Sequence, residues 1–447
     1  MMRHLARAVV LFPVVAALLI PAAAGASMVD GDIEVIRLEP APGTTFEIDG
    51  KTYGGDIALR WSRSGLALIE EVDVADYVLG IREVPYSWPA EALAAQAVAA
   101  RTYLARYVRG GRSGDRATYG FDICATSACQ VYRGIGSIDE SGGDRWVDAA
   151  EQTAGEILVF DGVPIEAVYS SSMGSRTRAN QDIWGGTPIP YLQPVDSPEG
   201  GASALASWTV AVYPRTFVEI LKADGHDIGG DLLAIATDDP GEGNGRTTIR
   251  VTTEEGSAEI LATRLKGVMN RHGPDLAPGL LPARRANGKR LPEVLPSYTY
   301  DIAIQETEPI DERLLDRLPP DDRPAPAMVR IDGEGWGHGV GMSQWGAYAM
   351  ARAGADHEEI LMHYYTGAEV VDAGEMLPDR VVVGLDWELS DASVTADGPF
   401  TMYVNDVRVG DGGAGPWTIR SRSRSIGVIP PVGQLVPGQI HVRHWPR

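Results

Sequence analysis

The sequence predicts an α+β fold with a central, buried, alanine-rich helix and β structure on both sides of it along the chain. Three observations support this. Short runs of β-forming residues, separated by Gly, Pro and Asp turns, occupy residues 30–75. One long helical pattern runs from Trp88 to Val108, and residues 371–447 return to a strand-like pattern.

Composition excludes several classes of function. The chain has 447 residues, and 61 acidic against 39 basic side chains give a formal net charge of -22. A nucleic-acid-binding protein needs a basic face, and anionic lipid attracts basic segments. We therefore expect neither nucleic acid nor a lipid surface as a partner.

Residues 1–26 are typical of a secretory signal peptide. Arg3 and Arg7 precede an apolar run, residues 8–20, and Ala24-Gly25-Ala26 offers the small residues of a cleavage site. The alternative, a retained membrane anchor, is disfavoured because a spanning helix needs about 20 apolar residues. We expect a secreted chain without a retained membrane span.

The N-terminal part, residues 27–75, is predicted to be β-rich. Its expected strands are Ile33–Leu38, Thr45–Ile48, Ile57–Trp61 and Leu66–Val72. The alanine-rich helix follows, with Ser87 as its expected N-cap and Pro89 in its first turn. Gln96 and Arg101 lie roughly 140° apart around that helix, so it has no single polar face. We expect it to be buried, with its polar side chains paired or facing a cleft.

Turn residues place the later elements. The pattern predicts a hairpin over residues 155–170 with Asp161-Gly162 at its turn, a Ser/Gly-rich loop from Ser170 to Thr177, and a surface connection from Leu318 to Pro326. A glycine-dense loop, Gly333–Gly341, leads into a helix over Ser343–Arg352 that Gly354 ends, and a second helix covers His357–Tyr365.

Two segments carry chemistry. Glu83 ends an extended stretch beside Val84, Pro85 and Trp88. Burial in a cleft there would raise its pKa and suit it to general acid catalysis, whereas on the surface it would be an ordinary turn residue. The second segment, residues 333–347, combines glycines, which permit close approach of a ligand or another strand, with aromatic and polar side chains. It is either a sugar-binding loop or a tight structural turn, and its candidate binding residues are Trp336, His338, Ser343 and Gln344.

The two cysteines, Cys124 and Cys129, stand five positions apart. Outside the cytoplasm such a pair can close a disulfide loop, although geometry decides. A zinc site would need further ligands, and free thiols are the third alternative.

Several segments, in the order found here, resemble the SpoIID/LytB family of bacterial cell-wall proteins. They are EVPYSWPAEALAAQAVAARTY, CATSACQVYRG, YSSSMGSRT, IWGG, PYLQPVDSP, LPS at 295–297, GWGHGVGMSQWGAYAMARAG and EILMHYYTG, spanning about Phe46 to Gly367. The chain departs from the family pattern twice. Ala128 stands where zinc-binding members carry histidine, and Ser175 replaces the second glycine of the S-x-G-G-x-T loop.

The resemblance implies a substrate groove beside the alanine-rich helix, with Glu83 as the catalytic acid and Arg101 in the groove. Arg101 could instead be a structural ion-pair partner. We expect Gln96, Ser172 and Arg176 to bind substrate with the four residues of the glycine-dense segment, and we expect no metal or other cofactor. Residues 76–370 would form the catalytic core and 371–447 a β-rich module, which is either a wall-binding unit or an extra layer.

The resemblance further implies an exported, wall-associated lytic transglycosylase. Its partners would be peptidoglycan glycan strands without stem peptides, which it would leave with 1,6-anhydro ends. The alternative is a non-catalytic wall-binding protein that enhances a cell-wall amidase.

Overall fold

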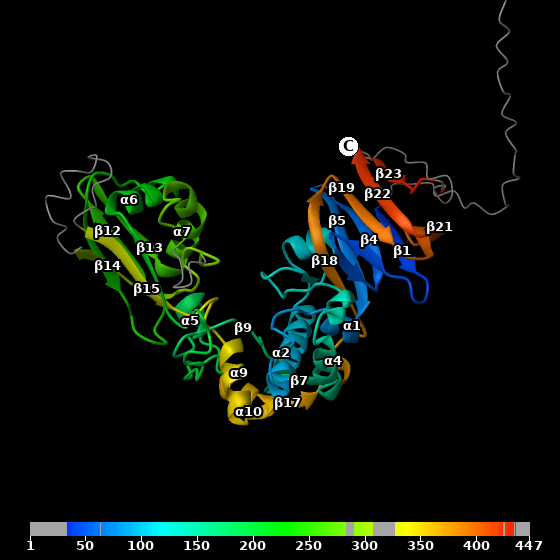
Figure 1. Ribbon diagram of the computed structural model, residues 1–447, viewed down its shortest axis with the longest axis horizontal. Coiled ribbons are helices and arrows are strands. Elements are labelled where there is room, and N and C mark those ends of the chain that lie inside the picture. Colours follow the sequence, from blue (N-terminus) through cyan, green and yellow to red (C-terminus); the bar gives the residue numbers. More distant parts are fainter. Residues whose placement is uncertain are drawn as a thin grey trace, which may run out of the picture.

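The structure is a computed structural model that describes residues 34–62, 64–282, 290–306, 327–422, 425–432 and 434. The predicted signal peptide, residues 1–26, and the predicted connection from Leu318 to Pro326 lie outside the described residues. Figure 1 shows two arms that rise from a helical base. The described chain contains both helices and strands, so the fold is α+β, as predicted.

One arm is a β-sandwich. Its larger sheet has the order β21 (Val407–Gly412), β20 (Phe400–Val404), β1 (Val35–Pro40), β4 (Asp56–Ser62), β5 (Gly65–Asp73), β18 (Arg380–Leu389), β6 (Ile123–Cys124). The smaller sheet has the order β23 (Ser425–Ile429), β22 (Gly415–Arg422), β19 (Asp391–Ala396), β2 (Phe46–Ile48), β3 (Lys51–Tyr53). Phe46, Phe400 and Trp417 pack edge to face inside it, with ring centroids 5.1–5.7 Å apart.

The sandwich joins the two ends of the described chain. Strand β1 pairs antiparallel with β20, and β5 pairs antiparallel with β18. The predicted division gave residues 27–75 to the family-like region and residues 371–447 to a β-rich module, either a wall-binding unit or an extra layer. Strands of the two segments pair with each other in both sheets, so each sheet is completed only by both segments.

The base holds the central helix, α2 (Ala90–Arg109). Its observed N-cap is Pro89, not Ser87 as predicted, because a turn with Trp88 N–H bonded to Pro85 O precedes it. The elements around it are α1 (Val74–Leu79), α3 (Asp115–Tyr119), η1 (Ile135–Asp139), α4 (Gly143–Gln152), β7 (Glu156–Phe160), β8 (Val163–Pro164), β9 (Tyr169–Ser170), α5 (Asn180–Ile183), β16 (Met342–Ser343), α9 (Gln344–Ala353), α10 (His357–Tyr364), β17 (Glu369–Asp372) and η3 (Gly374–Met376).

The second arm, residues 205–334, we call the inserted lobe. It has its own hydrophobic core, which includes Phe217, Leu265 and Ile331. Its elements are β10 (Trp208–Val212), α6 (Pro214–Ala223), β11 (Leu232–Asp238), β12 (Thr248–Thr253), β13 (Gly256–Leu261), α7 (Ala262–Leu276), β14 (Thr299–Glu306) and β15 (Ala327–Glu334). The sequence pattern predicted only a mixed stretch here.

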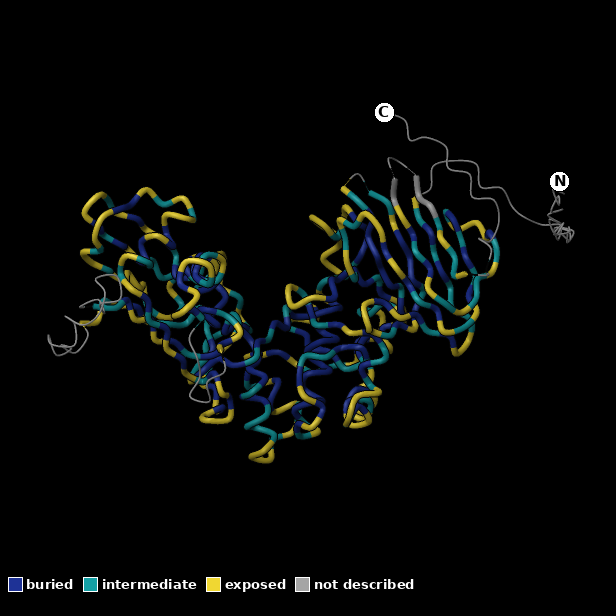
Figure 2. The backbone as a smooth tube through the Cα atoms, turned by 45° about the horizontal axis from the view of Figure 1, so that its top comes forward, coloured by how far each residue is buried: buried dark blue, intermediate teal, exposed yellow. Residues whose placement is uncertain are grey.

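The sandwich and the base share one core, so they form a continuous body. Figure 2 shows this burial running from the sandwich strands down into the base. Within the described part of the chain, no helix has both the length and the hydrophobicity that crossing a bilayer requires.

Candidate functional site

Two of the buried polar side chains of helix α2, Gln96 and Arg101, contact different neighbours. Gln96 is 1% exposed, and its Oε1 accepts a hydrogen bond from Gln344 Nε2 at 3.2 Å. Arg101, five residues later, turns instead toward the end of α4 and the start of β7. The two side chains therefore serve different parts of the molecule.

Arg101 is a structural residue in this arrangement. Its guanidinium donates to the carbonyl oxygens of Thr153 at 2.8 Å, Glu156 at 2.9 Å and Ala150 at 3.2 Å. Burial lowers its pKa from the ordinary value to about 10. The structure therefore places Arg101 elsewhere than in the predicted groove. Its guanidinium binds backbone carbonyl oxygens that would otherwise lack a donor where α4 ends, so we do not include Arg101 in the substrate site.

Glu83 lies half-buried between α1 and α2. Its Oε1 accepts a hydrogen bond from the Val131 backbone N–H at 2.6 Å and lies 3.4 Å from the Tyr169 hydroxyl. Burial raises the pKa of the Glu83 carboxyl, while hydrogen bonds from Val131, Tyr169 and Gln344 oppose the rise. The site therefore holds a carboxyl group that keeps its proton to higher pH than a free glutamate does.

Neutral groups surround this carboxyl. The Tyr169 hydroxyl lies 2.8 Å from Gln130 Oε1, and Gln130 Nε2 donates to the Tyr77 hydroxyl at 3.1 Å and to the Ala100 carbonyl at 3.2 Å. On the other side, Gln344 connects Glu83 with Gln96. Tyr169 and Gln130 were missed by the sequence analysis, although both lie within the segments that carried the resemblance.

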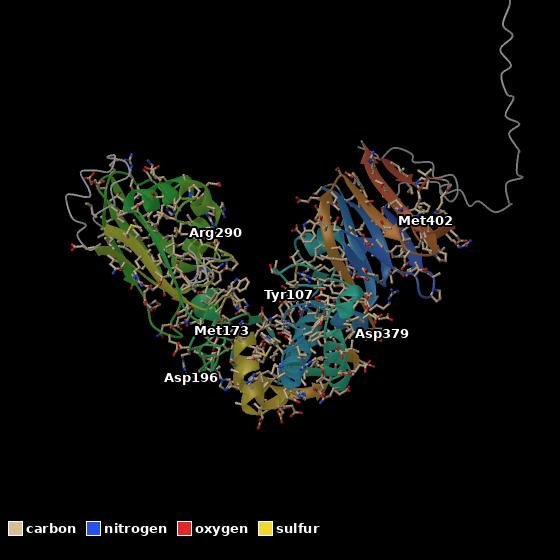
Figure 3. All side chains as sticks on the ribbon, in the orientation of Figure 1. Tyr107, Met173, Asp196, Arg290, Asp379 and Met402 are labelled. Atoms are coloured by element: carbon tan, nitrogen blue, oxygen red, sulfur yellow. A yellow bond between two sulfur atoms is a disulfide. The ribbon has the colours of Figure 1, made fainter. Side chains whose placement is uncertain are left out.

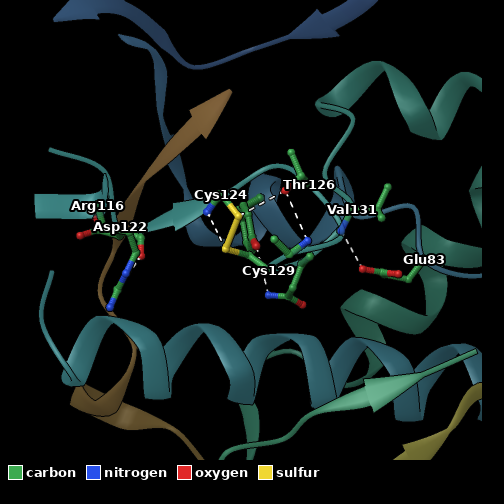
Figure 4. Close-up of a disulfide and its surroundings, with 10 residues drawn as sticks. Glu83, Arg116, Asp122, Cys124, Thr126, Cys129 and Val131 are labelled. Carbon is green, nitrogen blue, oxygen red and sulfur yellow. Dashed lines mark hydrogen bonds between the residues drawn. A yellow bond between two sulfur atoms is a disulfide. The ribbon is translucent and has the colours of Figure 1, made fainter. Parts of the chain in front are cut away.

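A disulfide between Cys124 and Cys129 shapes the chain that delivers the Val131 N–H (Figure 4). Within the loop, Cys129 N–H donates to the Thr126 carbonyl at 2.9 Å and Ala128 N–H donates to the Thr126 hydroxyl at 3.3 Å. Two sulfurs bonded to each other cannot serve as thiolate ligands. The residues here therefore do not fit the zinc site of some family members.

Glycines bring the segment 333–347 against β9. A Cβ at Gly341 would lie 2.0 Å from the Val168 carbonyl oxygen, and one at Gly337 would lie 2.3 Å from the Ser170 Cβ. Both glycines also have positive φ, 76° and 116°. The close approach lets β16 pair in parallel with β9, which carries Gln344 toward Glu83.

Glu199 is a buried carboxylate that the sequence analysis missed. Its Oε1 accepts from Met173 N–H at 2.7 Å and from the Ser343 hydroxyl at 2.9 Å, and Ser172 donates to its Oε2. Figure 3 places Met173 where the inserted lobe meets the base. The only signal of Glu199 in the sequence was its position just after the PYLQPVDSP segment.

This network changes the expected roles of two serines. Ser172 and Ser343 are 1% and 0% exposed, and both hydroxyls bind Glu199. Ser343 also accepts from Gly346 N–H at 3.0 Å as the N-cap of α9. Both were predicted to bind substrate, and in the structure their hydroxyls hold the loops around Glu199.

An exposed aromatic surface comprises Trp336, in the segment 333–347, and Trp184, at the end of α5. Trp336 is 36% exposed and Trp184, which the sequence analysis did not single out, is 44% exposed. His338 packs 5.1 Å from Trp184, between ring centroids, and hydrogen bonds to the Tyr169 backbone. Burial lowers the pKa of His338 to about 4, so its imidazole is neutral near pH 7.

Arg176 lies outside this cluster. Its guanidinium forms ion pairs with Asp196 and Glu242, at a place where all three side chains are open to solvent. Hydrogen bonds among the described residues thus connect Glu83 with Gln344, and Gln344 with Gln96. His338 joins this cluster through its hydrogen bond to the Tyr169 backbone. No contact among the described residues brings Arg176 or Arg101 to Glu83.

Comparison with known proteins identifies relatives. Residues 62–160 match the family model described as stage II sporulation protein. An uncharacterised protein of Brachyspira hyodysenteriae is 28% identical over 330 residues, 73% of this chain and 74% of that protein. Stage II sporulation protein D of Bacillus amyloliquefaciens is 26% identical over 69% of this chain and 77% of its own length.

An amidase enhancer of Bacillus subtilis is 28% identical over 64% of this chain, but the match covers 38% of the enhancer. The family match contains Glu83, the whole of α2 and the disulfide loop. These similarities support the SpoIID/LytB family: residues 62–160 match its family model, and the relatives include proteins named stage II sporulation protein D and amidase enhancer.

Proposed function

We propose that this chain is an exported lytic transglycosylase that acts at the cell wall on peptidoglycan glycan strands lacking stem peptides. The observation that carries the proposal is the Glu83 carboxyl, whose pKa burial raises and whose side-chain neighbours, Tyr169 and Gln344, are neutral. A single protonated carboxyl suits this reaction better than hydrolysis, which generally uses two.

In the proposed mechanism Glu83 first donates its proton to the glycosidic oxygen, and the leaving sugar departs as an oxocarbenium-like state forms. The Glu83 carboxylate then takes the proton of the 6-hydroxyl of the same muramic acid, whose oxygen attacks the anomeric carbon and closes the 1,6-anhydro ring. That hydroxyl is tethered, so its effective concentration is high. The part-buried hydrogen bond from Val131 N–H holds the carboxylate in place between the two steps.

The glycan itself would lie across the exposed aromatic surface. Trp336 and Trp184 offer ring faces for stacking on sugars, and a neutral His338 adds no charge there. Gln344 and Gln96 would supply amide contacts close to Glu83.

The test uses the mature chain, residues 27–447, and peptide-free glycan strands, with mass spectrometry to detect 1,6-anhydro ends. Glu83→Gln should retain the fold and reduce cleavage about 10²–10⁴-fold, because an amide cannot donate the proton. Parental cleavage should fall as pH rises through the raised pKa of Glu83, because only the protonated form is an acid. The matched control is Glu47→Gln, an exposed carboxylate on β2. Cleavage by Glu83→Gln at the parental rate would show that another group is the acid.

The amidase enhancer among the relatives supports a second candidate, a wall-binding protein that stimulates an amidase without cutting glycan. Adding Glu83→Gln to a wall amidase acting on intact peptidoglycan separates the two. Full stimulation by the variant, with no anhydro ends produced by the parent, would favour the enhancer.

A further inference from the structure

A cavity of about 730 Å³ opens in the inserted lobe, away from Glu83. Its walls come from β10, β14 and β15, from the loop after β11, and from residues 175–183. The volume lies within the range of small-molecule sites. None of the groups that contact Glu83 lines it, so it is a separate site.

The walls are strongly acidic. Six carboxylates line the cavity: Asp182, Asp239, Glu242, Asp301, Asp332 and Glu334. Like charges repel across such a space, so these walls favour a ligand that brings an ammonium group to them. The N-acetylated sugars of the glycan proposed for Glu83 carry no ammonium group, so that glycan does not match this cavity.

Two of these carboxylates face each other. Asp301 on β14 stands directly opposite Asp332 on β15 in the antiparallel register, a placement that costs stability when both are charged. Asp332 is bound by Arg330 and Thr209, but the Asp301 carboxylate has no ion pair or hydrogen bond to any described residue. An ammonium group beside Asp301 would relieve the repulsion.

One basic side chain lines the cavity together with the six carboxylates. Arg178 is the single basic side chain among the described residues that line the cavity. Its Nε donates to the Thr299 hydroxyl at 3.3 Å, and no described carboxylate pairs with it. Arg176, two positions earlier, is by contrast paired with both Asp196 and Glu242. Arg178 therefore keeps donors that a ligand carboxylate can use.

We propose that this cavity binds the zwitterionic end of a peptide, with the ammonium group beside Asp301 and Asp332 and the carboxylate on Arg178. Trp208 and Tyr300, which also line the cavity, provide apolar faces for the carbon chain between the two charges. This proposal does not depend on cleavage at Glu83. It assigns the inserted lobe to peptide recognition.

Isothermal titration of the mature chain, residues 27–447, tests it, with the wall tripeptide L-alanyl-γ-D-glutamyl-meso-diaminopimelate as probe. The peptide should bind, and acetylating the side-chain amine of its diaminopimelate should abolish binding. Arg178→Ala and Asp301→Asn should each weaken binding about tenfold or more, the effect of losing one charge-assisted hydrogen bond. Arg420→Ala, which removes an exposed side chain on β22 of the sandwich, is the matched control and should bind like the parent.

Three results would overturn the proposal: no binding of the tripeptide, equal binding of its acetylated form, or equal binding of a glucosamine tetramer, which has ammonium groups without a carboxylate. Asp301 makes no ion pair or side-chain hydrogen bond with described residues and stands opposite the like charge of Asp332, so Asp301→Asn should melt at or above the parental temperature. This variant therefore stays informative even if Arg178→Ala is destabilised. Because no glycan is present in the titration, the outcome is independent of whether Glu83 cuts.

Discussion

Replacing Arg101 with alanine should destabilise the protein without weakening glycan binding. The substitution removes three hydrogen bonds, of 2.8, 2.9 and 3.2 Å, and leaves three backbone carbonyls without their donor. A hydrogen bond to a charged group contributes about 1.5–3 kcal/mol, and the lower value applies because the variant also avoids the cost of burying the charge. Three such bonds amount to about 4.5 kcal/mol of unfolding free energy.

Urea denaturation followed by circular dichroism measures that loss. Arg106→Ala is the matched control, because Arg106 is an exposed arginine on the same helix. Arg101→Lys should fall between the parent and Arg101→Ala, since one ammonium cannot reach three carbonyls. Glycan affinity is measured by co-sedimentation at a temperature where the variant is folded. An unchanged urea midpoint together with a loss of glycan affinity would refute the structural role and return Arg101 to the groove.

Three further predictions concern other buried groups. Replacing Cys124 and Cys129 with serine should slow cleavage, because the backbone donor to Glu83 directly follows the loop that the disulfide closes; parental activity in that variant would show that the loop does not position the acid. Burial raises the pKa of Glu70 to about 7, so the folded state retains a proton that the unfolded state has lost, and stability should fall by up to about 3 kcal/mol as pH rises from 4.5 to 7. Glu70→Gln should remove most of this pH dependence in urea titrations at pH 5 and pH 8, and an unchanged dependence would assign it to other groups. Glu199→Gln should speed hydrogen exchange in the backbone of residues 171–175, because one carboxylate oxygen, an acceptor, is replaced by an NH₂ group, a donor. Parental exchange rates would contradict the anchoring role.

The regular elements were predictable because their signals are local. The alanine-rich pattern gave α2 to within two residues at its start, and Asp161-Gly162 marked the turn between β7 and β8, where both residues have positive φ. Gly354 ends α9 in the left-handed conformation, as its place after the helical pattern indicated.

The site was predictable only in part, because the partners of a side chain lie far away in sequence. Glu83 and Gln344 were found as separate candidates, but their connection through β9 and β16 depends on a parallel pairing that no local pattern reveals. Gln96 and Arg101 looked alike on one helix, and only the positions of α4 and α9 distinguish a site residue from a structural one. The contacts of Ser172 and Ser343 could not be predicted, because Glu199, their partner, carried no signal of burial in the sequence.

The pairing of the first strands with the last ones has a consequence for how the protein matures. Residue Val72 on β5 pairs with Val381 on β18, and Ile36 on β1 pairs with Val404 on β20. Such distant contacts form late, because closing the long intervening loop costs conformational entropy before the contact itself can stabilise the chain. During synthesis or export, the outer edges of β1 and β5 therefore stay unpaired until β20 and β18 emerge. Unpaired edges of this kind recruit other chains, so the molecule depends on protection from aggregation until nearly its whole length is available.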